Sequence, residues 1–409
     1  MRKDVFPITK TKILWTLSIA QFLAMQVWFN FSAVLPVVEQ EWQLTPTQSG
    51  IIIAFFHVGY VVAIIAYSML SDKYNPKYSF VFGAILAGLS GLCFSFFASG
   101  FWSALLLRTL SGIGIAGIYV PGMRILSSIF PPKQRGKAIG IYVGALVVGS
   151  GSSLLVSGLL LDSVGWNGVI TVTSLLCLFA AILVSFLALP QEAFASSGEP
   201  LRLSKIKKVF RKPNLLVNGG YAGHCWELYA MWAWIGPFLV YYLITQGFET
   251  SSAIRYGNVF GAIVIMVGGF ATYYGGRLSD AIGRIKAANI FLLISIFCSL
   301  SIGWLLQAPI WLMVLIALLY GFTIVADSPI YNVAITEVSD PDSVAIALGV
   351  QSVFGFTVTI FSPIVFGVVL DHFHWGAAFT VIGLVTIIAP ICLFTLQKIQ
   401  HTTGLFFTK

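Results

Sequence analysis

Charged residues are scarce in this chain of 409 residues. Lys, Arg, Asp and Glu together make up 9% of the sequence, whereas a typical soluble domain carries about 25%. Hydrophobic residues account for 58%, and the mean hydropathy is +0.91. A soluble domain of this size could not bury so much apolar surface. The composition therefore excludes a soluble globular protein and predicts a membrane protein.

Other features that the sequence lacks exclude several functions. No Gly-x-x-x-x-Gly-Lys loop is present to bind ATP, and no pairing of a nucleophile with a base is visible, so we expect no enzyme activity and no cofactor. The five cysteines all fall within apolar runs, which predicts free thiols. The basic residues are scattered over short loops, so no nucleic-acid patch is expected. The first apolar run is too long for a cleavable signal and is interpreted as a signal anchor.

Long apolar runs dominate what is present. Each run is near the length of about 20 residues that crosses the hydrocarbon core of a bilayer. The predicted spans are 13–37, 46–70, 78–98, 101–127, 137–161, 167–189, 215–243, 253–276, 286–306, 310–335, 344–370 and 375–397. Because their number is even, both termini are predicted to lie on the same side of the membrane.

The basic residues indicate which side that is. All but three of the 23 Lys and Arg residues fall on the face that holds both termini, the exceptions being Arg108, Arg124 and Arg255. Cytoplasmic loops carry an excess of Lys and Arg. We therefore expect a multi-pass protein of a bacterial-type inner membrane with both termini in the cytoplasm, and the net charge of +8 favours contact with anionic lipid.

The sequence also repeats itself. At an offset of 209 residues, Gly59 matches Gly268, Gly112 matches Gly321, Gly158 matches Gly367, Asp162 matches Asp371 and Trp166 matches Trp375. Two parallel repeats of six spans are typical of transporters whose halves rock about a central site. The repeat predicts an N-terminal six-helix bundle at 1–190, a cytoplasmic linker at 191–214 and a C-terminal six-helix bundle at 215–409.

Three motifs resemble those of the major facilitator superfamily. They are the run from Gly276 to Lys286 with a partial copy at Ser68–Lys73, the glycine-rich stretch from Arg108 to Gly117, and the loop Pro131–Gly136. The resemblance covers essentially the whole chain. It implies an all-α membrane fold of twelve transmembrane helices in two pseudo-symmetric six-helix bundles, working by alternating access.

The first of these motifs is predicted to act in the conformational change. Its residues are Asp72, Gly276, Asp280, Gly283 and Arg284. Gly276 is expected to let two helix ends approach closely, and Asp280 to cap or pair at a helix terminus. The N-terminal copy has Ser68 in place of the glycine, so the two halves are not expected to be latched equally.

Polar residues within the spans are the candidates for function. A charge near the bilayer centre costs about 3 kcal/mol on insertion scales, so such a residue is expected to face a cavity or a partner. The resemblance implies that spans 1, 4, 7 and 10 line the central cavity. The candidates in those spans are Gln21, Gln26 and Asn30 in span 1, Arg108 and Arg124 in span 4, His224 and Glu227 in span 7, and Asp327 in span 10.

We predict proton coupling at Glu227, with Asp327 and His224 as further members of the site. His224 and Glu227 are three residues apart and share a helix face. Burial disfavours the charged form of a carboxyl group unless an arginine holds it charged. Protonation of Glu227 would then release Arg108 or Arg124 to bind an anionic or polar substrate. Ser328-Pro329 beside Asp327 and Gly236-Pro237 in span 7 are expected to interrupt helix hydrogen bonding and to make bending easy.

Each of these residues also has a structural interpretation. Arg108 could tie span 4 to neighbouring carbonyl groups or to span 1, Arg124 could snorkel to the cytoplasmic surface, and His224 could be a satisfied core histidine. Glu227 and Asp327 could form fixed salt bridges. The rings of span 7 that could touch substrate, and could equally pack on lipid or on neighbouring helices, are Trp226, Tyr229 and Trp234.

Together these features predict a monomeric, proton-coupled secondary transporter of a small polar or anionic organic solute. Proton-driven efflux of an amphipathic compound is an alternative, disfavoured because span 5 lacks a Gly-Pro pair. A transporter-like membrane sensor is another, disfavoured because the linker and tail are too short for an appended domain. Metal transport is a further alternative, with possible ligands at His224, Cys225, Glu227, Met123 and Met231, but no second strong ligand pair is present, and no metal site is predicted.

Overall fold

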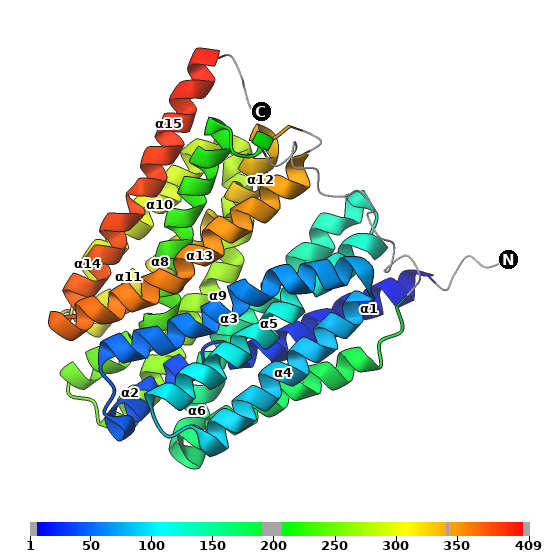
Figure 1. Ribbon diagram of the computed structural model, residues 1–409. Coiled ribbons are helices and arrows are strands. Elements are labelled where there is room, and N and C mark those ends of the chain that lie inside the picture. The colour runs from blue at the N-terminus through cyan, green and yellow to red at the C-terminus, as the bar shows by residue number, and fades with distance from the viewer. Residues whose placement is uncertain (1–5, 190–206, 341–342, 404–409) are drawn as a thin grey trace. The chain divides into compact units, whose positions relative to one another are not determined.

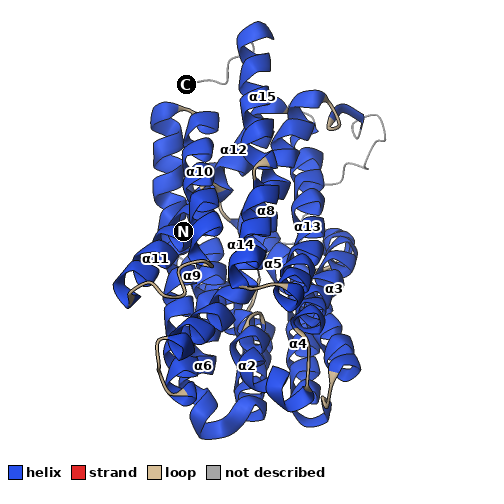
Figure 2. Cartoon of the chain, turned by 90° about the vertical axis from the view of Figure 1, so that its left-hand side faces the viewer, coloured by secondary structure: helices blue, strands red, loops and turns tan. Residues whose placement is uncertain are grey.

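The computed structural model describes residues 6–189, 207–340 and 343–403, and within these ranges every regular element is helical (Figure 2). The elements are coloured along the chain in Figure 1. They are α1 (Phe6–Ala24), η1 (Met25–Val27), α2 (Asn30–Trp42), α3 (Pro46–Lys73), α4 (Pro76–Phe97), α5 (Phe101–Ile129), α6 (Pro132–Ser185), α8 (Lys212–Thr245), α9 (Thr250–Ile282), α10 (Arg284–Ile302), α11 (Ile310–Ala326), α12 (Ser328–Val338), α13 (Val344–His372), α14 (Trp375–Thr386) and α15 (Ile388–Thr403).

Eleven helical stretches in the described chain are long and apolar enough to cross a membrane. One of them runs over 52 residues, from Gln134 to Ser185, and it is interrupted at Gly165, whose φ of 67° and ψ of 174° are not helical. Because glycine adopts positive φ without steric cost, this residue separates the predicted spans 137–161 and 167–189. The eleven stretches therefore correspond to the twelve predicted spans.

Two predicted spans are broken inside the membrane. Span 1 consists of α1, the short η1 and α2, and span 10 consists of α11 and α12 on either side of Asp327. The predicted break at Ser328-Pro329 is thus confirmed. At Gly236-Pro237 the helix α8 continues to Thr245 with Pro237 inside it; because proline has no backbone N–H, one hydrogen bond of the helix is missing there. All five cysteines are free thiols, as predicted.

The chain divides into two compact units. The N-terminal unit comprises Met1–Leu44, Ile51–Gly198 and Glu249–Ala262, and the C-terminal unit comprises Thr45–Gly50, Glu199–Phe248 and Ile263–Lys409. The first turn of α3 thus belongs to the C-terminal unit, and the first half of α9 belongs to the N-terminal unit. Most of the predicted linker 191–214 lies outside the described residues, and the proposed domain boundaries stay a prediction.

The sequence repeat reappears as a repeat in packing. A β-carbon added to Gly112 of α5 would lie 1.9 Å from the carbonyl oxygen of Phe56 in α3, and one added to Gly321 of α11 would lie 2.1 Å from that of Val264 in α9. Only glycine allows backbones to approach so closely. The same glycine therefore joins the corresponding pair of helices in each unit.

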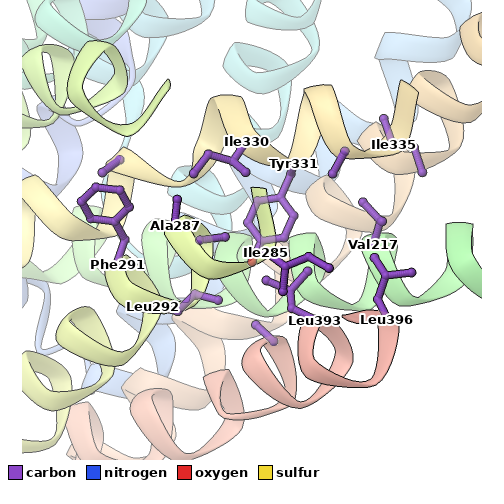
Figure 3. Close-up of a cluster of buried hydrophobic side chains, with 14 of the residues drawn as sticks. Val217, Ile285, Ala287, Phe291, Leu292, Ile330, Tyr331, Ile335, Leu393 and Leu396 are labelled. Carbon is purple, nitrogen blue, oxygen red and sulfur yellow. The ribbon is translucent and has the colours of Figure 1, made fainter. Parts of the chain in front are cut away.

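A buried hydrophobic cluster fixes α12 in the C-terminal unit (Figure 3). Tyr331 points from α12 into this cluster, toward Ile285 of α10. Val217 of α8 and Leu393 of α15 belong to the same cluster. The helix α8 itself packs against α12, α13, α14 and α15. Because α12 begins at Ser328, this packing also sets the position of the break at Asp327.

The motif at 276–286 forms the turn between α9 and α10. Gly283 has a φ of 92°, a left-handed conformation that favours glycine. Arg284 forms an ion pair with Asp280 and donates hydrogen bonds to Ser279 Oγ at 2.9 Å and to Glu337 Oε1 at 3.3 Å. The arginine thus ties the turn to the end of α12.

The close helix approach predicted at Gly276 occurs one residue earlier. A β-carbon added to Gly276 would meet no atom within 4 Å, whereas one added to Gly275 would lie 1.7 Å from the carbonyl oxygen of Ala326. The prediction at Gly276 is therefore wrong, because Gly275 is the residue that faces α11. The side chain of Asp72 lies outside the described part of the structure.

Candidate functional site

The candidate site in the C-terminal unit is built around the break in span 10. Asp327 ends α11 with φ of −84° and ψ of −15°, and Pro329 occupies the first turn of α12. Proline has no backbone N–H and cannot continue the hydrogen-bond ladder of α11. The break places the Asp327 side chain in the interior, where the residue is 1% exposed.

His224 of α8 contacts both residues at this break. Its Nδ1 lies 2.9 Å from Asp327 Oδ1, and its Nε2 lies 2.9 Å from Ser328 Oγ. A carboxylate only accepts hydrogen bonds, so Nδ1 carries a proton when Asp327 is charged. Nε2 can then accept from the serine hydroxyl in the neutral ring or donate to it in the imidazolium. The arrangement therefore accommodates both protonation states of the histidine.

Two neighbouring tyrosines pack against the imidazole. The ring centroids of Tyr221 and Tyr331 lie 5.9 Å and 5.5 Å from that of His224, and 5.7 Å from each other. Gln351 of α13 donates a hydrogen bond of 3.2 Å to the backbone oxygen of Tyr331. The histidine is therefore held by ring packing against two tyrosines as well as by contacts at both nitrogens.

Glu227 lies one turn further along α8 and is 1% exposed. Its Oε2 accepts a hydrogen bond of 2.9 Å from Ser295 Oγ of α10, and Tyr320 of α11 lies close enough to interact with it electrostatically. The other carboxyl oxygen accepts no hydrogen bond from the described residues. Within that part of the chain neither Glu227 nor Asp327 forms an ion pair with Lys or Arg.

The predicted proton-coupling residues thus fall into two neighbouring contacts. His224 pairs with Asp327, and Glu227 binds a serine instead of the predicted arginine. Sequence reasoning missed Ser295 and the tyrosines. A hydroxyl in an apolar helix carries no signal of its own, because serine commonly bonds to a carbonyl of its own helix. Ser328 could have been found as the neighbour of Asp327.

Arg108 in the N-terminal unit is buried and binds residues at the break in span 1. Its Nη1 donates hydrogen bonds to Val27 O at 2.9 Å and to Asn30 Oδ1 at 3.1 Å, and its Nη2 donates to Trp28 O at 2.9 Å. The guanidinium also lies over the Phe56 ring, 4.5 Å from the centroid. These contacts match the structural interpretation of Arg108, in which it fastens span 4 to span 1.

Two of the predicted polar residues of span 1 also form hydrogen bonds that hold this break. The Gln26 amide donates to Gly149 O at 3.2 Å and to Ser152 Oγ at 2.6 Å in α6. Asn30 Nδ2 donates to Thr173 Oγ1 at 2.9 Å. Gln21 differs, because it is fully buried and neither of its amide atoms has a hydrogen-bond partner among the described residues.

The remaining predicted substrate residues occupy varied positions. Arg124 of α5 and Trp226 and Tyr229 of α8 are half-buried. Trp234 is buried and stacks on Phe366 of α13, with the ring centroids 5.1 Å apart. Trp234 therefore belongs to the aromatic core of the C-terminal unit, which matches the packing interpretation of that ring.

Comparison with known proteins adds to these observations. A sequence model of the Major Facilitator Superfamily matches residues 17–356 and 228–405. A hexuronate transporter of Bacillus subtilis is 23% identical, and the match covers 88% of each chain. Among solved structures, a D-xylose–proton symporter gives a TM-score of 0.78 at 16% identity, covering 94% of this chain and 97% of the other. A bacterial homologue of the human lysosomal transporter Spinster gives 0.77 at 17% identity, covering 97% and 98%.

Proposed function

Because the chain belongs to the major facilitator superfamily, and so is a multi-pass membrane transporter of small solutes and not an enzyme, we propose that protons drive its transport through Glu227 and the His224–Asp327 pair. The observation that carries this proposal is that two carboxyl groups, each 1% exposed, lie beside a helix break without a Lys or Arg partner in the described chain.

The surroundings of Glu227 suit a group that binds and releases a proton. An ionised carboxylate buried with only neutral hydroxyl groups nearby is unfavourable, since desolvation costs more than such hydrogen bonds return. Uptake of a proton removes that cost, and hydration of the site allows the proton to leave. Glu227 therefore links its protonation to whether water reaches the site, which is the requirement for coupling protons to alternating access.

The His224–Asp327 pair supplies a second protonation step. With a neutral ring the pair carries one negative charge, and with an imidazolium it is neutral, while the Ser328 hydroxyl adapts to both forms. Since Asp327 separates α11 from α12, a change in the pair acts directly on the point where span 10 can bend. Protonation is thereby connected to helix movement.

The proposed solute is small and either polar or anionic. The similarity to a hexuronate transporter and to a D-xylose–proton symporter supports a solute of this kind. Arg124, Trp226 and Tyr229 are the proposed solute contacts, being half-buried side chains of spans 4 and 7. Gln21 joins them as a buried amide free to bind a hydroxyl group. We also propose a monomer in the inner membrane with both termini cytoplasmic.

Uptake into proteoliposomes tests the proposal. Labelled D-glucuronate, D-galacturonate and D-xylose are offered with and without an inward proton gradient. The gradient is expected to raise uptake by wild-type protein, and E227Q and D327N are each expected to lose that stimulation. Glu249 is exposed, so E249Q is the matched control and should retain it. If both site variants kept the stimulation, the coupling role would be refuted.

A further inference from the structure

An open apolar groove lies between α1 and α6 in the N-terminal unit. Its volume is about 280 Å³. It is lined by Trp15, Ser18, Ile19 and Phe22 of α1 and by Ile141, Gly144, Ala145 and Val148 of α6. Trp15 is 53% exposed at its edge, whereas Ser18 is buried and its hydroxyl has no hydrogen-bond partner in the described chain.

The two helices run in parallel with a fixed register. Ser153 Oγ donates to Gln26 O at 2.6 Å, and a β-carbon at Gly149 would lie 2.9 Å from Phe22 O. Each pair is separated by 127 residues, so later residues of α1 lie beside later residues of α6. The same separation of 127 residues, applied toward the beginnings of both helices, places Lys12 beside residue 139. The beginnings of α1 and α6 therefore lie at the same end of the groove.

That end of the groove is basic. Lys12 is exposed and lies three residues before Trp15, and Lys137 is exposed and lies four residues before Ile141. At 1.5 Å per residue both are about one helical turn beyond the apolar lining. Arg135 is exposed on the same turn of α6. The groove thus has an apolar floor inside the membrane and cationic side chains at one end.

We propose that this groove binds an anionic phospholipid, with one acyl chain between α1 and α6 and the phosphate at Lys12 and Lys137. The apolar lining suits an acyl chain, and basic side chains at helix ends attract anionic head groups. Trp15 is suited to the boundary between head group and acyl chain.

Thermal unfolding of the purified full-length protein in a neutral detergent tests the site. Phosphatidylglycerol is titrated against phosphatidylcholine, and inorganic phosphate is titrated separately. A ligand that binds the folded state raises the unfolding temperature. Wild-type protein should be stabilised by phosphatidylglycerol and by neither of the others. Equal stabilisation by phosphatidylcholine or by inorganic phosphate would overturn the proposal.

The chain offers matched variants for both parts of the site. A β-carbon added to Gly144 or to Gly140 meets no atom within 4 Å, but only Gly144 lines the groove. G144L should therefore abolish the response to phosphatidylglycerol, while G140L keeps it. K12Q and K137Q should each weaken binding about fivefold, whereas K286Q, at an exposed position in the other unit, should not. Unchanged affinity in G144L and in the K12Q/K137Q double variant would refute the site.

Discussion

Replacing Arg108 by glutamine should destabilise the protein because the break in span 1 would lose its support. The guanidinium donates three hydrogen bonds, two of them to the backbone oxygens of Val27 and Trp28. Side-chain hydrogen bonds in a membrane protein average about 0.6 kcal/mol each, and those made by charged groups contribute about 1.5–3 kcal/mol. At about 0.6 to 1.5 kcal/mol for each bond, loss of all three predicts a destabilisation of about 2–5 kcal/mol.

The assay is thermal and denaturant unfolding of purified R108Q beside wild-type protein. R135Q is the control, since Arg135 is exposed at the start of α6. R108K keeps the charge but not the planar set of donors, and should recover only part of the loss. Solute affinity measured on the protein that remains folded should be nearly unchanged, because Arg108 acts on the backbone of span 1.

One outcome would refute this reasoning for Arg108. If R108Q unfolded like R135Q and yet bound solute at least tenfold more weakly, its contacts with span 1 would contribute little to stability. Arg108 would then be a substrate-binding residue, as the first prediction from the sequence had it.

Three further predictions concern packing and the turn after α9. H224L should destabilise the protein by about 3 kcal/mol, because it leaves Asp327 buried without its partner. Adding D327N to H224L should recover part of this loss. If the losses of the two single variants simply added in the double variant, the pairing would be contradicted. G321V should cost at least about 2 kcal/mol on thermal unfolding, because its β-carbon would overlap a backbone oxygen in α9, and wild-type stability would refute that contact. G283A should cost about 1–2 kcal/mol through its positive φ, an estimate contradicted if Tm does not fall.

The membrane spans could be predicted from the sequence because lipid imposes a simple rule. Every residue facing hydrocarbon must be apolar, so the runs are visible in one dimension. The repeat was equally readable, since glycines such as Gly112 and Gly321 are placed where backbones touch and no other residue fits. The helix ends follow the predicted spans closely for the same reason.

The helix breaks were predictable only where proline marked them. Pro329 signalled the break at Asp327, whereas α8 stays helical through Pro237. The break at 25–29 in span 1 contains neither proline nor glycine. It is supported by Arg108 and Ser153 from other helices, so the local sequence could not reveal it.

The carboxyl and imidazole groups of the candidate site could be predicted from the sequence, but the residues that contact them could not. A buried carboxyl or imidazole is conspicuous in an apolar run because its burial is costly. Which group compensates that cost depends on the approach of distant helices, and so the partner of Glu227 turned out to be Ser295. Packing between helices also sets how α9 is rotated about its axis. For this reason Gly275, and not Gly276, faces α11.

Proton movement that accompanies solute uptake tests the coupling role of Glu227 most directly. Proteoliposomes containing a pH-sensitive dye are given the first of the three test solutes that wild-type protein accumulates, with no imposed gradient. The proposal predicts that wild-type protein acidifies or alkalinises the lumen as solute moves, and that E227Q still exchanges labelled for unlabelled solute but moves no protons. Proton movement by E227Q equal to that of wild-type protein would contradict the account.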